Sequence, residues 1–147
     1  MSFKANVVQA LGDGTFHKGL GALKPKDADH ITSARPRDLV GSADLDAALA
    51  ATMPDAHRWD YVVGKSVGKS VSAHWIEVHP ASSTRNIDEV GRKLAWLAGW
   101  LHGNPLGQYP KDVVWVASGK STYNTRSPAI KALAAKGCRF VGAHLAL

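Results

Sequence analysis

The pattern of hydrophobic and polar residues in the middle of the chain predicts two β-strands separated by a polar, glycine-rich stretch. Trp59–Val63 is rich in aromatic and β-branched residues and stops at Gly64. The same chemistry resumes over Val71–His79. The stretch between them, Gly64–Ser70, has the glycine-rich composition of a turn. The pattern therefore predicts an antiparallel hairpin.

A strongly amphipathic helix is predicted after this hairpin. Asn86 is the predicted N-cap, with Glu89 three residues on in a capping-box arrangement, and Gly103 and Pro105 end the helix. Its apolar residues recur at the spacing of one helical face, over Ile87, Val90, Leu94, Leu97 and Leu101. A shorter helix, capped by Ser42 or Asp44, is expected before the hairpin and ends at Thr52.

The last third of the chain predicts a strand, a helix and a strand. Val113–Ala117 is apolar throughout, as in a strand that is covered on both faces. Ser127 and Pro128 begin a helix that runs to Lys136, and Cys138–Ala143 is the last strand. Such short connections imply a right-handed crossover and parallel pairing. The expected fold class is α/β: a mixed central sheet, in which an antiparallel hairpin is followed by helix-strand-helix-strand, flanked by helices.

Residues 1–37 show no sustained periodicity. They contain six Lys or Arg and one short helical pattern, Ala5–Leu11, which Gly12 would stop. We interpret this segment as a basic, glycine-rich N-terminal arm or irregular extension, either flexible or wrapped on the core. Residues 38–147 are interpreted as a single α/β domain.

Length, composition and charge limit the classes of protein to which the chain can belong. A length of 147 residues with 45% hydrophobic content suits one domain, and no apolar run approaches the ~20 residues of a membrane helix. Without a signal-peptide core, a cytoplasmic protein with no membrane partner is expected. Cys138 is the only cysteine, which excludes an internal disulfide and a cysteine-rich zinc site. The net charge of +6 favours polyanionic partners, although many basic domains owe such a charge to solubility alone.

Two segments have compositions that can bind phosphate. In the first, only three residues separate Gly64 from Gly68, where a Walker A loop needs four, and a strand follows instead of a helix. A hairpin turn is the better interpretation. The second, Ser118–Arg126, joins the buried strand to a helix, where ligands of α/β sheets gather. It fits either an ordinary polar loop or a phosphate site, in which Lys120 and Arg126 would contact the backbone of a nucleic acid.

Two carboxylates on the hairpin form the strongest candidate for chemistry. Alternation along a strand places Glu77 and His79 on the same face. If the hairpin turns between Gly68 and Lys69, Asp60 lies directly opposite Glu77. Two carboxylates so close repel each other unless a cation lies between them. Oxygen ligands of this kind suit Mg²⁺ or Mn²⁺, and the imidazole adds a nitrogen ligand or orients a water.

This arrangement resembles the PD-(D/E)xK nuclease family of restriction enzymes and Holliday-junction resolvases. The resemblance covers residues 42–143: an Asp on a strand, sixteen intervening residues, Glu-x-basic on the next strand, then a helix and a buried strand. It implies a restriction-endonuclease-like fold in which Asp60 and Glu77 bind Mg²⁺ and His79 fills the position of the motif Lys. The chain departs from the family because no Pro precedes Asp60, because His replaces Lys, and because only two strands are evident before the central helix, where the family has three. The missing Lys could come from the helix or the hairpin, at Lys93, Arg92, Lys65 or Lys69.

The leading hypothesis is therefore a divalent-metal-dependent nuclease, a hydrolase that binds DNA. Its metal ligands are Asp60 and Glu77, and its catalytic residues are Asp60, Glu77, His79 and Lys93. The residues expected to bind nucleic acid are Lys65, Lys69, Lys120 and Arg126.

Other interpretations stay open. Glu77 could lie on the solvent face of an edge strand, with Asp60 paired to Arg58 or Lys65. The same fold could serve as a non-catalytic nucleic-acid-binding or protein-interaction module, or bind phosphate or nucleotides through residues 118–126. A homodimer is also compatible with the sequence.

Overall fold

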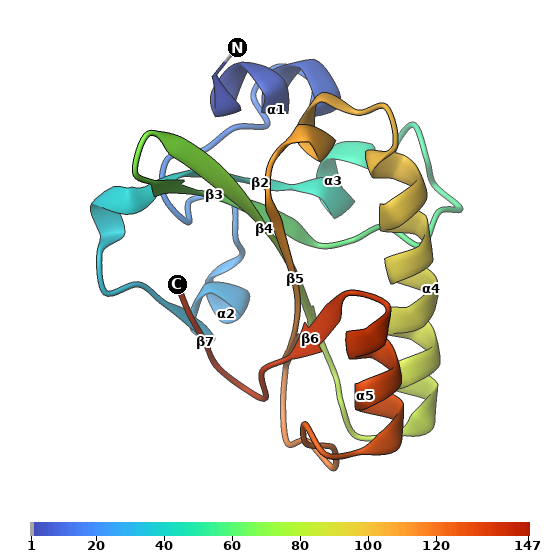
Figure 1. The fold of residues 1–147 in the computed structure, drawn as a ribbon. Helices are drawn as coiled ribbons and strands as arrows, with labels where there is room; N and C mark the ends of the chain where they lie inside the picture. The colour runs from blue at the N-terminus through green and yellow to red at the C-terminus, as the bar shows by residue number, and fades with distance from the viewer. Residues whose placement is uncertain (1) are drawn as a thin grey trace.

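A five-stranded mixed β-sheet organises the computed structural model, which describes residues 2–147 (Figure 1). Its strands are, in spatial order, β2 (Leu39–Asp44), β3 (Tyr61–Val67), β4 (Ser70–His79), β5 (Lys111–Ala117) and β6 (Cys138–Phe140). The first three pair antiparallel, and β4, β5 and β6 pair parallel. The predicted mixed α/β class is confirmed.

The β3–β4 hairpin has the predicted register. Tyr61 pairs with Ile76 and Val67 pairs with Ser70, which leaves Gly68 and Lys69 as a two-residue turn. Gly68 has a φ of 62°, a conformation that glycine adopts without steric cost. Glycine at the first central position is typical of a type II′ turn, whose twist matches that of the strands. The turn therefore fixes which residues of the two strands face each other.

Helices α4 (Thr84–Leu101) and α5 (Pro128–Ala135) cover one face of the sheet (Figure 1). The predicted apolar face of α4 is buried against the sheet, except that Ile87 is only half-buried. The predicted N-cap is wrong: α4 begins earlier, with Ser83 as N-cap, and Asn86 is the N3 residue of the capping box. Both side chains satisfy backbone groups at the helix start, so Glu89 takes no part in capping.

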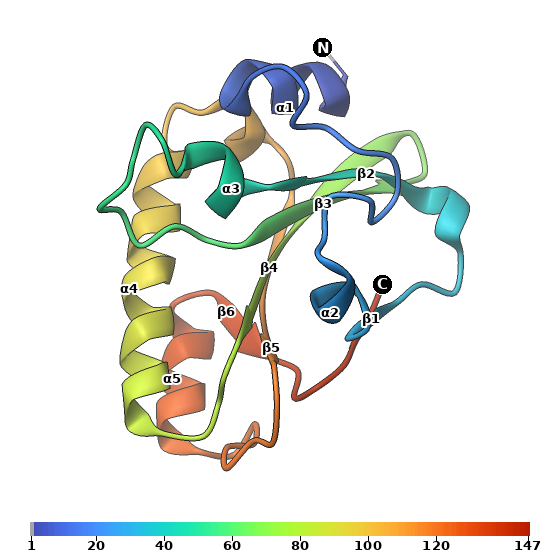
Figure 2. The same cartoon turned by 180° about the vertical axis from the view of Figure 1, so that it is seen from behind.

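The opposite face of the sheet is covered by segments from both ends of the chain (Figure 2). The four-residue helix α2 (Pro25–Ala28) lies there beside a small parallel sheet of β1 (Ile31–Thr32) and β7 (Leu145–Ala146). Ile31 and Leu145 are buried against Ile76 and Val114 of the central strands. The apolar run of β5 is thus covered on both faces, as its composition predicts.

The N-terminal segment packs on the core along most of its length. Helix α1 (Phe3–Leu11) begins at the N-cap Ser2 and ends at Gly12, and its residues Phe3 and Val7 are buried. The ring of Phe3 also makes an edge contact with Tyr109, which follows the 3-10 helix Pro105–Gln108. This packing corresponds to the wrapped alternative for residues 1–37.

Strand β2, helix α3 and strand β6 differ from the sequence-based expectation. Strand β2 was not predicted, and the helix before the hairpin, α3, is limited to Leu45–Leu49 with Asp44 as N-cap. The last strand β6 stops at Phe140, and the chain then leaves the sheet toward β7. In β2, Gly41 is required by packing, because a Cβ there would lie 2.7 Å from the carbonyl oxygen of His17. In residues 2–147, no helix combines the length and apolar character that crossing a membrane requires.

Candidate functional site

Asp60 and Glu77 lie side by side where β3 begins. Continuing the hairpin register by one pair beyond Tyr61 and Ile76 sets them opposite each other. The backbone N–H of Asp60 donates to Glu77 Oε1 at 3.2 Å, and the N–H of Val78 donates to Asp60 Oδ2 at 3.0 Å. Each carboxylate is thus held by a backbone group of the neighbouring strand, which fixes its direction.

Lys93 reaches this pair from helix α4. Its Nζ lies 2.5 Å from Glu77 Oε2 and 3.8 Å from Asp60 Oδ1. The helix carries Val90, Leu94 and Leu97 into the core, and Lys93 lies at the margin of this buried face. The neighbouring Arg92 is exposed and points away from the sheet. Of the basic residues proposed to replace the motif Lys, Lys93 is the one that contacts both carboxylates.

His79 and Glu89 extend the group into a continuous network. His79 Nδ1 lies 3.4 Å from Glu77 Oε2, and its Nε2 lies 2.8 Å from Glu89 Oε2. Glu89 Oε1 in turn lies 3.2 Å from Arg85 Nε. We refer to Asp60, Glu77, His79, Glu89 and Lys93 as the charged cluster. Glu89 was missed as a site residue, although its spacing of four residues from Lys93 places both on one helical face.

Burial distinguishes this cluster from an ordinary surface network. Glu77 is fully buried, on a strand flanked by β3 and β5, so it is not on the solvent face of an edge strand. The Asp60 side chain is 20% exposed. Arg58, one of the alternative partners of Asp60, pairs instead with Asp46 at 2.9 Å. The alternative in which these carboxylates are unrelated surface charges is therefore wrong.

Burial and neighbouring charges shift the pKa values of three side chains in the cluster. Burial, with the added repulsion of Glu77, raises the pKa of Asp60 to about 7, despite the opposing effects of Lys93 and the Val78 N–H. The hydrogen bond to Glu77 raises the pKa of His79 against the effect of its burial. Burial opposes the charge of Lys93, but Glu77 and Asp60 outweigh it and raise its pKa. Burial and Glu77 therefore oppose the negative charge of Asp60, and positive groups beside it favour that charge.

Asp60 and Glu77 are the residues of the cluster whose oxygens could hold a hard divalent cation that retains water. Within residues 2–147, no three His, Cys, Asp or Glu side chains converge as a complete protein-built metal site would require. Mg²⁺, however, is commonly held by one or two carboxylates, with water and substrate oxygens as its remaining ligands. Asp60 Oδ1 accepts no hydrogen bond from the described residues, and its carboxyl group has a raised pKa. Asp60 and Glu77 are therefore the residues that would hold such an ion.

A cavity of about 430 Å³ opens beside Asp60, on the side of the sheet away from α4. Asp60, Pro80 and Ser118 form one wall, where the parallel strands β4 and β5 end. Lys24 and Lys26 are among the residues of the other wall, and both belong to the N-terminal segment. These lysines were not predicted as site residues, because residues 1–37 carry no pattern that indicates where they fold.

The basic residues predicted to bind nucleic acid lie in two other places. Lys65 is half-buried on β3 and Lys69 is in the hairpin turn, at the end of the strand remote from Asp60. With a rise of about 3.3 Å per residue, that turn lies roughly 25 Å along the strand from the carboxylates. Lys120 and Arg126 are exposed in the loop between β5 and α5. The structure therefore does not bring the hairpin lysines to the charged cluster.

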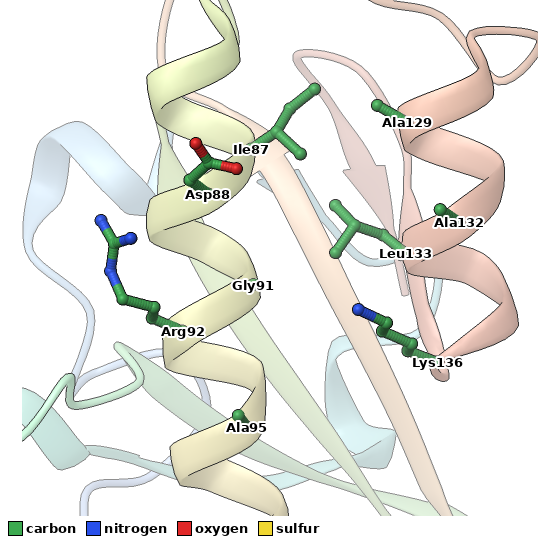
Figure 3. Close-up of a pocket in the computed structure, with 9 residues that line it drawn as sticks. All are labelled: Ile87, Asp88, Gly91, Arg92, Ala95, Ala129, Ala132, Leu133 and Lys136. Carbon is green, nitrogen blue, oxygen red and sulfur yellow. The ribbon is translucent and has the colours of Figure 1, made fainter.

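A second cavity of about 430 Å³ lies between α4 and α5 (Figure 3). Ile87 and Leu133 project into the space between the two helices, and Gly91, Ala95 and Ala132 leave it open. No residue of the charged cluster lines this groove, and its lining includes no pair of carboxylates. The groove between α4 and α5 is therefore separate from the charged cluster.

Comparison of the chain with family models, with curated proteins and with solved structures finds no match. Its function is therefore inferred from residues and geometry alone.

Proposed function

We propose that this protein is a divalent-metal-dependent phosphodiesterase that cleaves DNA, with its active site in the charged cluster. The observation that carries the proposal is the buried pair of Asp60 and Glu77, joined by Lys93 at 2.5 Å from Glu77 and 3.8 Å from Asp60. Keeping such a pair charged costs folding free energy, because burial and mutual repulsion both oppose its charge, and perturbed groups of this kind cluster at functional sites. A bound cation would relieve both effects.

The order of elements supports the resemblance to PD-(D/E)xK nucleases. Strand β2 adds a third antiparallel strand before α4, where the sequence indicated only two. Asp60 precedes the second of these strands, and Glu77 and His79 end the third. Lys93 offers the amino group that the motif lacks at position 79. These features favour the restriction-endonuclease-like interpretation of the fold.

Each side chain of the cluster has a distinct proposed role. Asp60 and Glu77 would hold Mg²⁺ or Mn²⁺, and when bound such an ion polarises a phosphoryl oxygen and lowers the pKa of its water. Lys93 presents an ammonium group beside both carboxylates, where the charge of a phosphodiester is also attracted. His79 is held between Glu77 and Glu89, so both His79 and Glu89 act as positioning residues for Glu77.

The experiment that tests this proposal is a cleavage assay on purified protein. Labelled single-stranded, double-stranded and branched DNA are incubated with Mg²⁺, Mn²⁺ or EDTA. Cleavage is expected with metal alone. It should fall by about 10² to 10⁴-fold in Glu77→Gln and in Lys93→Met, the range typical of losing a positioned catalytic group.

Two control variants distinguish a loss of catalysis from a loss of folding. Asp88→Asn changes a carboxylate on α4 that lines the groove toward α5, and Lys131→Met changes an exposed lysine of α5. Both should cleave as the wild type does. If the wild type leaves every DNA substrate intact with either metal, or if Glu77→Gln cleaves normally, the enzymatic proposal fails.

The same cluster also supports a second candidate, a non-catalytic nucleic-acid-binding module. The observation that favours it is the Lys93 ammonium itself, which already lies between the carboxylates and supplies part of the positive charge they require. For this module, DNA binding should persist in EDTA and survive Glu77→Gln, with no cleavage under any condition.

A further inference from the structure

We propose that the cavity beside Asp60 binds one nucleotide unit of the DNA chain next to the scissile bond, with Lys24 and Lys26 contacting its phosphate. This inference rests on the proposed function for its substrate class. It assigns a binding role to the N-terminal segment.

The position of the cavity links it to the charged cluster. Asp60 contributes to its wall while its carboxylate also faces Glu77 and Lys93 on the other side. Pro80 and Ser118 bound the cavity where the parallel strands β4 and β5 end, the edge at which α/β sheets usually bind ligands. Its volume of about 430 Å³ is within the ~300 to 1,000 Å³ typical of small-ligand sites. One nucleotide unit is of the size that such a site holds.

The lysines on the opposite wall have no acidic partner. Among the described residues, no carboxylate oxygen lies within 4.0 Å of the ammonium nitrogen of Lys24 or Lys26. Asp27 also lines the cavity, and the Tyr61 hydroxyl donates to its Oδ2 at 2.5 Å. Two unpaired ammonium groups on a concave surface attract a phosphate, since both charges remain available to it.

His30 also lines the cavity. Its Nδ1 lies 2.7 Å from the carbonyl oxygen of Ala143, so Nδ1 carries the hydrogen and donates it. In this tautomer Nε2 has no partner among the described residues, and it can accept a hydrogen bond from a base N–H of the nucleotide unit. The backbone of His30 is fixed as well, because the N–H of Leu145 donates to its carbonyl at 2.9 Å. The imidazole is therefore held on a rigid element at the cavity wall.

The segment that carries these residues is anchored to the sheet. The Tyr61 hydroxyl accepts a hydrogen bond from the backbone N–H of Lys24 at 3.3 Å while donating to Asp27. Tyr61 is itself buried and directly follows Asp60 in sequence. The lysine wall and the carboxylate wall are therefore both positioned at the start of β3, by the adjacent residues Asp60 and Tyr61.

The charges of the two walls favour a nucleic-acid chain over a free anion. Asp60 and Asp27 repel a phosphate that enters alone, and Lys24 and Lys26 attract it. A cation held by Asp60 and Glu77 would make both walls attractive, so that the scissile phosphate lies at the cluster and a neighbouring phosphate lies at the lysines.

The test measures DNA binding without cleavage. The anisotropy of a fluorescein-labelled single-stranded oligonucleotide is followed in EDTA, for the wild type and for Lys24→Ala/Lys26→Ala. The double variant should bind about tenfold or more weakly, because charge-assisted contacts are lost. The slope of log affinity against log salt should fall by about 0.7 for each phosphate contact removed. His30→Ala should weaken binding to a smaller extent.

A second double variant controls for general charge. Lys131→Ala/Lys136→Ala removes two exposed lysines of the α5 region and should retain the wild-type affinity. If both double variants weaken binding equally, or if Lys24→Ala/Lys26→Ala binds as the wild type does, the inference is overturned. Asp60→Asn gives an opposite readout: it should bind the oligonucleotide more tightly in EDTA, and weaker binding would contradict the assignment of the two walls.

The outcome is independent of catalysis, because EDTA abolishes metal-dependent cleavage. Loss of binding in Lys24→Ala/Lys26→Ala together with a wild type that never cleaves would support the cavity and refute the nuclease. A thermal-shift titration with inorganic phosphate and with a mononucleotide distinguishes the sources of phosphate. Stabilisation by either one equal to that by the oligonucleotide would replace the nucleic-acid chain with a small free ligand, which contradicts the inference.

Discussion

Replacing Asp60 by Asn should remove a pH-dependent loss of folding stability. The pKa of Asp60 is raised from 3.8 to about 7 in the folded protein, first by burial and then by Glu77. A carboxyl with a raised folded pKa contributes stability below its unfolded pKa, and this stability is lost as the pH rises through the folded value. The wild type should therefore become less stable between pH 4 and pH 7. Asparagine does not ionise, and its side-chain oxygen can still accept the Val78 N–H.

The magnitude follows from the size of the pKa change. At about 1.4 kcal/mol per pH unit, a rise from 3.8 to about 7 corresponds to roughly 4 kcal/mol over the whole range. Between pH 5 and pH 8 the expected part is about 2 to 3 kcal/mol. For a chain of this length, that difference corresponds to roughly 5 to 10 °C in Tm.

The assay is urea unfolding at pH 5 and at pH 8, followed by the fluorescence of the buried tryptophans Trp59, Trp75 and Trp115. Other groups also titrate in this range, so the quantity that matters is the wild-type change minus the Asp60→Asn change. Asp88→Asn serves as the matched control and should follow the wild type. Parallel stability profiles for the wild type and Asp60→Asn would refute the account of a buried, repelling carboxylate pair.

Three further predictions concern the scaffold around the site. Gly64→Ala should destabilise the protein by about 1 to 3 kcal/mol in chemical unfolding, because the new Cβ would lie 2.6 Å from the buried ring of Phe3; an unchanged midpoint would mean that α1 does not pack on β3. Cys138 is buried and its pKa is raised to about 12, so thiol reagents should label it only at the rate at which the protein opens; immediate labelling in native buffer would contradict this. Arg139 donates to both oxygens of Asp112 at 2.8 Å and holds the pKa of that carboxyl below its usual range. Arg139→Ala should therefore cost no more than about 1 kcal/mol at pH 7, since Arg139 is half-exposed, and that cost should shrink as the pH falls below 4; a cost that grows in acid would exclude this linkage.

The sequence sufficed to predict the part of the site that depends on local geometry. A glycine-rich turn fixes the hairpin register, and the register sets Asp60 opposite Glu77 without further information. The apolar stripe of α4 likewise determines which helical face meets the sheet, and Lys93 lies at the margin of that face. These features follow from the two-residue period of a β-strand and the 3.6-residue period of an α-helix. Both periods are visible in short stretches of sequence.

The sequence did not indicate the parts that depend on distant contacts. Strand β2 contains Gly41, Ser42 and Asp44, which are typical of turns and helix caps, and pairing with β3 overrides those preferences. Residues 1–37 have no periodic pattern because they cover the sheet with short elements. Their lysines line the cavity beside Asp60, where Tyr61 anchors the segment through Lys24 and Asp27.

Glu89 illustrates a competing interpretation of one residue. A Glu three residues after a candidate N-cap usually completes a capping box. With Asn86 as the predicted N-cap, the sequence therefore assigned Glu89 a capping role. Because α4 begins at Thr84, Asn86 takes the N3 position of the capping box. Glu89 is then free to contact His79. A shift of three residues in the helix start thus converts a capping residue into part of the charged cluster.

The central claim is that Asp60 and Glu77 jointly hold a divalent cation, and it is tested most directly by titrating Mn²⁺ into the protein at pH 8 and counting free ions by electron paramagnetic resonance. The account predicts one saturable site per chain in the wild type, competed by Mg²⁺ and lost in Glu77→Gln, whereas Asp88→Asn binds normally. Absence of saturable binding in the wild type, or equal binding in Glu77→Gln, would contradict it.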